Sequence, residues 1–380
     1  MRPSNNTNTT SPVAGPAAKS LTPEPPTTAW QWIVIDTMDG PANASLILDG
    51  SNPRRFSRLA RSSIARNGSA AHCIEPLVNE VTTDGATHDK YFHDRTDHVH
   101  HMIAVPVLGP FGAVHAVAMW VGKINEPLPR IPIIGAVEWD ASGLVSASPA
   151  AQFLLRTRHG DALTGHTITE MLAALDHLED RSGFLALFNM TNLATPTDQW
   201  SGIATTTDET GQKHDIFLAA RPTVVNGERR VRAVVADITG TANPGRPDLT
   251  LAAIRHMPVP PGHVLALADL ITGFIHEFMC APNSPLVAWR HHNPIFTDDD
   301  HIEVANACFS LAAGVVDTVT SRVNVRFSPD GEPILLDARW TRVLDGERPQ
   351  ALIDITPISQ IPSPVVPGCR ACEEIAANQP

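Results

Sequence analysis

The sequence has few cysteines, few lysines and few aromatic side chains. Its five cysteines are an odd number scattered over 380 residues, which excludes the disulfide framework of a small secreted domain. The 28 basic residues include only four lysines and are outnumbered by 40 acidic ones, so the net charge is −12. Because a chain this acidic lacks the electrostatic footprint of a nucleic-acid-binding protein, we expect no nucleic-acid partner.

Segments that would direct the chain to or through a membrane are also missing. Residues 1–28 are rich in Asn, Thr, Ser and Pro and lack the basic and apolar zones of a signal peptide, so we interpret them as a disordered arm. The uncharged stretch from Met102 to Gly122 is long enough to span a bilayer, but its prolines and a Gly-Pro-Phe-Gly turn favour a β-hairpin. We therefore expect a cytoplasmic protein without a membrane span.

What the sequence does contain is enough apolar material for packed cores, together with many turns. Hydrophobic residues make up 43% of it, beside 33 prolines and 24 glycines. Proline-bearing breaks at 126–129, 241–247 and 357–367 divide it into blocks of about 100 to 110 residues. Three small domains in series are the expected organisation.

An internal repeat supports this division. Residues 220–239 and 338–356 share Ala-Arg, Thr, Val, a Gly-Glu-Arg turn and a closing Asp-Ile-Thr, and the two endings lie 117 residues apart. Each copy has the pattern of a β-hairpin that turns at Asn226-Gly227 or at Asp345-Gly346, and a glycine turn upstream of each predicts a three-stranded meander. The repeat indicates that one small domain was duplicated.

The block that ends in the first copy resembles a PAS domain. Residues 133–239 open with a strand, an Asp-x-x-Gly turn, a second strand and a Ser-Pro-Ala helix start at Ser148, and they end in the Asp-Ile-Thr of the usual PAS exit. Residues 250–356 keep the same C-terminal half after a divergent opening. Residues 30–124 resemble a GAF domain through their terminal hairpin. The whole order is similar to that of the actinobacterial GAF–PAS–PAS tandem sensor family, which lacks an output domain.

This resemblance implies an α+β fold of three sequential small domains, each an antiparallel sheet with helices packed on it. It also implies a homodimer, which is the habit of the resembling folds. The expected segments are a disordered arm (1–28), a GAF-like domain (29–125), a first PAS-like domain (130–240), a second PAS-like domain (247–358) and a proline-rich tail with a CxxC (359–380).

Two helices are expected from local patterns. The arginines between residues 54 and 66 predict one helix with a solvated basic face, and binding of an acidic partner or anion is the alternative role of that face. Thr297 and three following aspartates predict the capped N-terminus of another. Its apolar stripe is expected at Ile302, Ala305, Phe309, Ala312 and Val316.

Histidines gather in the first block. Six of the 17 lie within residues 72–101, interspersed with aspartates, a mixture that suits zinc or another divalent metal. The same stretch also fits a solvated loop before the terminal hairpin. On a strand that begins here, His98 and His100 share one face and His101 lies on the other, so His98 and His100 are the candidate ligand-binding residues.

The tail carries Cys369 and Cys372 as a lone CxxC, which is half of a zinc site. We treat the pair as candidate metal ligands that two tails of a homodimer could combine. Free surface thiols are the alternative.

No catalytic template is present, since Walker, Gly-x-Ser-x-Gly, Gly-x-Gly-x-x-Gly and zincin patterns are all missing. We therefore expect a non-catalytic sensory adaptor that binds a small ligand or a signalling protein through its GAF- and PAS-like domains and passes the signal to a separate output protein. The alternatives are a scaffold with filled cores, or a metal- or redox-responsive protein that uses the histidine-rich loop or the CxxC. The sequence identifies no cofactor.

Overall fold

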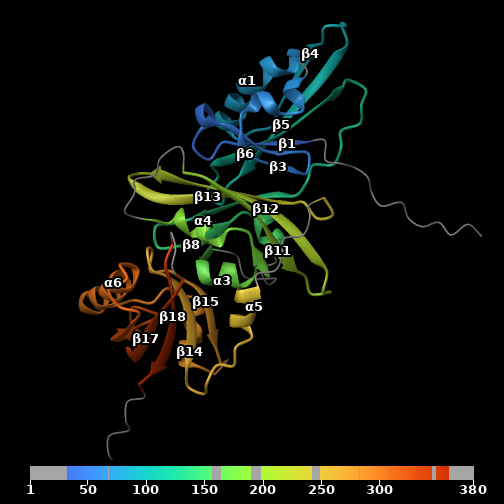
Figure 1. Cartoon of the computed structure of the whole chain (residues 1–380). Coiled ribbons are helices and arrows are strands. Elements are labelled where there is room, and N and C mark those ends of the chain that lie inside the picture. The colour runs from blue at the N-terminus through green and yellow to red at the C-terminus, as the bar shows by residue number, and fades with distance from the viewer. Residues whose placement is uncertain are drawn as a thin grey trace, which may run out of the picture.

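The computed structural model of the chain describes residues 32–66, 68–155, 164–189, 198–241, 249–281, 283–344 and 348–358. These residues form three antiparallel sheets of six, seven and five strands, which lie in series (Figure 1). The expected α+β class is confirmed. The predicted arm at 1–28 and the CxxC of the tail lie outside the described residues. Among the described helices, none combines the length and the apolar character needed to cross a membrane.

The first sheet has the strand order β3-β2-β1-β6-β5-β4. Its strands are β1 (Ile33–Asp36), β2 (Ser45–Asp49), β3 (Asn52–Ser57), β4 (His88–His93), β5 (Val99–Leu108) and β6 (Val114–Lys123). The helix α1 (Gly68–Asp84) packs on one face of the sheet through Ile74, Leu77, Val78 and Val81. Because β5 pairs with β6 from His100 to Leu108, the hairpin predicted over 102–122 is confirmed.

The second sheet has the order β10-β11-β12-β13-β7-β8-β9. Its strands are β7 (Ile134–Trp139), β8 (Leu144–Ala147), β9 (Thr164–Thr167), β10 (His177–Leu178), β11 (Trp200–Thr207), β12 (Lys213–Val225) and β13 (Glu228–Asp237). The short helices α2 (Pro149–Leu154), α3 (Ile168–Ala173) and α4 (Arg181–Ala186) cover one of its faces. The side chains of Ser148 and Thr167 cap α2 and α3 by accepting hydrogen bonds from backbone N–H groups.

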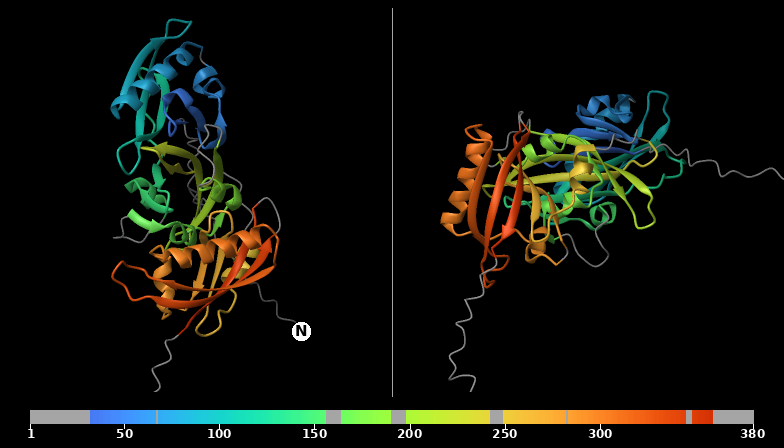
Figure 2. Two further views of the ribbon diagram at one scale, coloured as in Figure 1. Left: turned by 90° about the vertical axis from the view of Figure 1, so that its left-hand side faces the viewer. Right: turned by 60° about the horizontal axis from the view of Figure 1, so that its bottom comes forward.

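The third sheet has the order β15-β14-β18-β17-β16. Its elements are α5 (Leu249–Arg255), β14 (Val264–Asp269), β15 (Ile275–Cys280), the 3-10 helix η4 (Pro285–Arg290), α6 (Asp298–Ala312), β16 (Thr318–Val325), β17 (Ile334–Leu344) and β18 (Gln350–Pro357). The two views of Figure 2 place α6 along the outer face of this sheet, at one end of the molecule.

The three sheets share one arrangement. In each, the first strand lies between its hairpin partner and the last strand, and the closing meander fills the other side. The predicted meanders are confirmed as β11–β12–β13 and β16–β17–β18. Asn226 and Gly227 have φ of 53° and 83°, the two left-handed residues that a tight turn between β12 and β13 requires. The sequence repeat is therefore a repeat of topology as well.

The helix predicted over residues 54–66 is wrong. The segment begins within β3 and continues as the short 3-10 turns η2 (Leu59–Arg61) and η3 (Ile64–Arg66). Arg55 and Phe56 have φ of 44° and 55°, and the register of β2 with β3 shifts between Leu46 and Leu48. This irregularity bends the chain where a helix would need regular negative φ values.

The helix predicted after Thr297 is confirmed as α6, but its predicted apolar stripe is wrong. Ile302 and Phe309 are 57% and 71% exposed, whereas Ala307, Cys308 and Leu311 are buried against the third sheet. Asp300 sets this rotation. Its buried carboxylate accepts hydrogen bonds from the backbone N–H of Asn324 and from the hydroxyl of Thr297, so the face that carries it must point inward.

Candidate functional site

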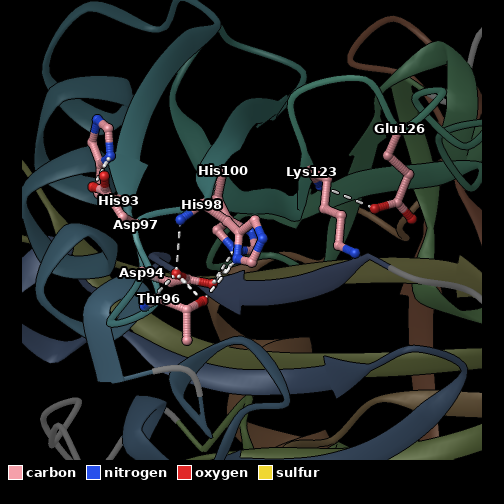
Figure 3. A network of polar contacts seen from close by, with 8 residues as sticks. All are labelled: His93, Asp94, Thr96, Asp97, His98, His100, Lys123 and Glu126. Carbon is pink, nitrogen blue, oxygen red and sulfur yellow. Dashed lines mark hydrogen bonds and ion pairs between the residues drawn. The ribbon is translucent and has the colours of Figure 1, made fainter.

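The histidine-rich hairpin of β4 and β5 is organised around Asp94. Its carboxylate accepts hydrogen bonds from the backbone N–H of Thr96 at 2.8 Å and of His98 at 3.0 Å, and it lies 2.9 Å from Nε2 of His100 (Figure 3). The hydrogen bond from the Thr96 hydroxyl and the contact with His100 hold the pKa of Asp94 well below its usual range. The structure thus brings His98 and His100 together on one side of the hairpin, as expected.

The same turn recurs in the second sheet. Asp208 accepts hydrogen bonds from Thr210 and Gln212, and it lies 3.2 Å from Nε2 of His214, the residue six positions later, as His100 is from Asp94. The hydroxyl of Thr210 and the backbone N–H of Gln212 again hold the pKa of the aspartate below its usual range. An arrangement that occurs in two sheets at equivalent turns stabilises a hairpin. His98 is 70% exposed and His100 is 14% exposed. Their role as ligand-binding residues stays a prediction.

The other histidines of this hairpin pair separately. His93 lies 3.0 Å from Asp97, and His101 lies 3.0 Å from Asp89. Within the described part of the histidine-rich stretch, no three ligand atoms are close enough together to hold a metal. Cys369 and Cys372 lie outside the described residues.

The first and second sheets pack face to face. Apolar side chains of β1, β2 and β6 meet those of β7, β12 and β13, and the alanines among them allow the strands to approach closely. The buried members include Val34, Ile47, Leu48, Ala116, Ala136, Phe217, Ala219, Val234 and Ala236. We call this contact the first interface.

A buried ion pair crosses the first interface. Arg221 of β12 places its Nε atom 2.8 Å from Oδ2 of Asp36 on β1, and the two side chains are 5% and 1% exposed. The same guanidinium donates to the hydroxyl of Ser45 and lies over the ring of Phe56. Burial raises the pKa of Asp36 to about 6, although the charge of Arg221 opposes this rise.

A second buried carboxylate, Glu138 of β7, contacts side chains of both sheets. It accepts hydrogen bonds from Arg230 at 2.6 Å and from Arg232 at 3.0 Å, and His115 of the first sheet lies 3.5 Å away. Arg232 also donates to the carbonyl of Met38. Burial alone would raise the pKa of Glu138, but these neighbours outweigh burial and lower it to about 2. The first interface is therefore apolar and is crossed by a buried ion pair.

A second interface joins the helices of the second sheet to β15 and α5. Glu277 is 4% exposed and receives hydrogen bonds from Arg181 of α4 and Arg255 of α5. Arg255 also donates to the carbonyls of Leu172 and Leu175 near α3. Next to this group, His276 is buried, and burial together with the charge of Arg181 lowers its pKa to about 3.

Arg348 adds a further link between these elements. It pairs with the fully buried Asp269 of β14 and donates to the carbonyl of Leu185 in α4. Sequence reasoning missed all of these buried charges. The available signal was a charged residue at an inward position of an otherwise apolar strand, as at Asp36, Arg221 and Asp269.

A hollow of about 380 Å³ lies beside the start of α6. Ile295, Phe296 and Pro333 supply apolar walls, while Asn324 and Arg326 supply polar groups. Its volume falls in the range of small-molecule sites, and its mixture of an apolar wall with a few polar groups is typical of them.

Comparisons with known proteins place these features in a wider context. Residues 31–130 match the family model described as Rv3651-like, N-terminal. None of the curated proteins matches the sequence. The crystal structure of an uncharacterised protein from Mycobacterium tuberculosis is similar with a TM-score of 0.67 and 16% identity, over 87% of this chain and 97% of that one. At such identity the likeness concerns the fold alone.

Two other structures are similar at lower scores. One is an RNA-binding light-oxygen-voltage receptor, with a TM-score of 0.23 and 11% identity over 64% of this chain and 99% of that one. The other is the PAS domain of nitrogen regulation protein NR(II) from Vibrio parahaemolyticus, with a TM-score of 0.20 and 12% identity over 28% of this chain and 89% of that one. At these scores neither bears on function, and the GAF–PAS–PAS order stays a prediction. The chain is thus similar in its first block to the Rv3651-like N-terminal model, and in its fold to the mycobacterial protein.

Proposed function

We propose that the chain is a non-catalytic sensory adaptor that binds a small ligand or a protein partner and passes the signal to a separate output protein. In this proposal each sheet with its helices is one domain, GAF-like at 29–125 and PAS-like at 130–240 and 247–358. The shared strand order of the three sheets supports this division. If the three sheets formed one continuous structural unit instead, the sequence repeat would have no explanation.

The observation that carries the proposal is the ionic first interface. The buried Arg221–Asp36 ion pair crosses this interface, and His115 of the first sheet lies 3.5 Å from Glu138 of the second. Because a displaced interface would leave Asp36 and Arg221 buried without each other, only discrete packings of the two sheets are favourable. A ligand or partner that binds one packing better than another shifts the balance between them, which is the thermodynamic requirement for signalling.

The hollow near Arg326 is the proposed ligand site. With apolar residues and Arg326 in its lining, it suits a small molecule with an apolar body and a carboxylate, since arginine pairs well with planar anions. The test is a melting-temperature screen of the tag-free full chain with aliphatic and aromatic carboxylic acids. A ligand at 100 times its Kd stabilises the folded state by about 2.7 kcal/mol.

The matched variants are Arg326→Ala and Arg322→Ala, which remove arginines of one segment. Arg322 pairs with Asp337 and is not among the residues that line the hollow. We expect ligands to raise the melting temperature of the parent and of Arg322→Ala, and to leave Arg326→Ala unchanged. Equal responses in both variants would contradict the assignment of the ligand to this hollow.

One observation favours a second candidate function, a scaffold with filled cores. The helix-covered core of the second sheet is packed with aromatic rings: Phe184 lies 5.5 Å from Trp139, 5.4 Å from Phe188 and 5.1 Å from Trp200, measured between ring centroids. Rings at this spacing leave little room for a ligand in that core. If neither the carboxylate screen nor a nucleotide screen shifts the melting temperature, and natively purified protein carries no small molecule, the scaffold is the better account.

A further inference from the structure

Three side chains of the kinds that bind metal ions, from two parts of the chain, meet at the second interface. His166 lies on β9 and Glu170 on α3, whereas His291 directly follows η4. The Nδ1 atom of His166 is 2.5 Å from Oε2 of Glu170, and the Nδ1 atom of His291 is 3.0 Å from Oε1 of the same carboxylate. One ligand atom from each residue lies within 4.8 Å of the other two.

The backbone around these residues is held from both sides. The Thr167 hydroxyl accepts a hydrogen bond from the N–H of Glu170 and donates one, 2.6 Å long, to the carbonyl of Arg290. Beyond His291, the side-chain amide of Asn293 donates to the carbonyl of Ser142 at 2.8 Å. The three ligands therefore sit on segments whose positions are fixed independently of the ligands themselves.

We propose that His166, Glu170 and His291 bind a zinc ion. Two imidazoles with one carboxylate suit zinc and neighbouring transition ions, whereas magnesium and calcium prefer oxygen ligands alone. A tetrahedral zinc ion separates its ligand atoms by about 3.3 Å, so small side-chain rotations from the present spacing are enough. Zinc replaces the two histidine–glutamate contacts, and water takes the fourth position.

The ion would act as a clasp between the second and third sheets. His166 and Glu170 move with β9 and α3, while His291 moves with η4, which packs beside β15. Binding energy gained only when both sides are in place stabilises this packing over any other. His291 is 52% exposed, which gives an ion access from solvent. The clasp does not depend on the sensory role proposed above.

The test is zinc titration of the tag-free full chain by calorimetry after chelator treatment. A Cys369→Ser/Cys372→Ser background removes the CxxC as a competing site. We expect one zinc ion per chain in this background and no heat with magnesium. Replacing zinc by cobalt should give the visible absorption of a nitrogen- and oxygen-ligated ion without thiolate bands.

Matched variants decide whether the assigned residues hold the ion. His291→Ala should weaken zinc binding by about a hundredfold, because a tridentate site then retains two ligands. His292→Ala removes the exposed neighbouring histidine and should leave binding unchanged. Zinc should also slow amide exchange in both α3 and η4 of the parent. Absence of stoichiometric zinc binding in the Cys369→Ser/Cys372→Ser background, or equal loss in the two variants, overturns the proposal.

Discussion

Replacing Arg221 by methionine measures what the buried ion pair contributes to the first interface. Methionine fills much of the same space but leaves Asp36, 1% exposed, without the guanidinium that lies 2.8 Å away. Removing one partner of a buried pair costs about 3–5 kcal/mol, because the remaining charge is buried and unpaired. The contact of Arg221 with the hydroxyl of Ser45 is lost as well. We expect the free energy of unfolding to fall by this amount at pH 8.

The size of this loss should depend on pH, because Asp36 titrates. Burial raises its pKa from 3.8 to about 6, so between these values the folded chain holds a proton that the unfolded chain has released. Rising pH therefore removes stability across this window. Near pH 5 the carboxyl is mostly protonated in the parent and in the variant, so losing Arg221 costs only about 1 kcal/mol in hydrogen bonds. At pH 8 the full cost of an unpaired charge appears.

The assay is urea unfolding followed by tryptophan fluorescence at pH 5 and pH 8. Arg339→Met is the matched control, since Arg339 occupies the equivalent place in the repeat but is exposed. It should change stability by less than about 0.5 kcal/mol. The double variant Asp36→Asn/Arg221→Met should lose the extra cost at pH 8. An equal loss at both pH values in Arg221→Met would refute the reasoning that a buried charge causes it.

Two further predictions concern the third sheet. Burial and Arg181 lower the pKa of His276 to about 3, so below pH 6.5 the unfolded state binds a proton that the folded state does not bind. Acidification to pH 5 should therefore lower the free energy of unfolding by up to about 2 kcal/mol. His276→Gln should remove that part of the acid sensitivity in a pH series of urea unfolding curves. Leu311→Ala should lower the free energy of unfolding by about 2–5 kcal/mol and Phe309→Ala by less than about 0.5 kcal/mol, because only Leu311 is buried. The reverse order in thermal unfolding would mean that α6 packs through its other face.

Local sequence patterns predicted the elements whose cause is local. Asn226-Gly227 specifies its tight turn through backbone conformation, and Thr297 specifies a helix start through a side-chain cap. The rotation of α6 was not predictable in this way. It follows from the burial of Asp300, whose partner Asn324 is 24 residues away, and apolar spacing alone favoured the wrong face.

The residues of the candidate site were even harder to predict, because contacts between distant segments bring them together. The turn that places His100 beside Asp94 was readable from the sequence, since the same Asp-x-Thr spacing precedes His214. Of the zinc site proposed above, the sequence indicates only the pair His166 and Glu170, which are four residues apart. Its third ligand, His291, is placed there by the packing of η4 beside β15 of the third sheet. No local sequence pattern encodes that packing.

The second sheet is covered on both of its faces, by its own helices on one side and by the first sheet on the other. Its central strands β7, β12 and β13 cannot separate until at least one neighbouring layer has come away. The two layers that cover it, the helices on one face and the first sheet on the other, can in contrast each open without disturbing the other. The chain therefore has a built-in order of disassembly, in which the middle of the molecule is the last part to exchange its amide hydrogens with solvent and the last to become accessible to a protease.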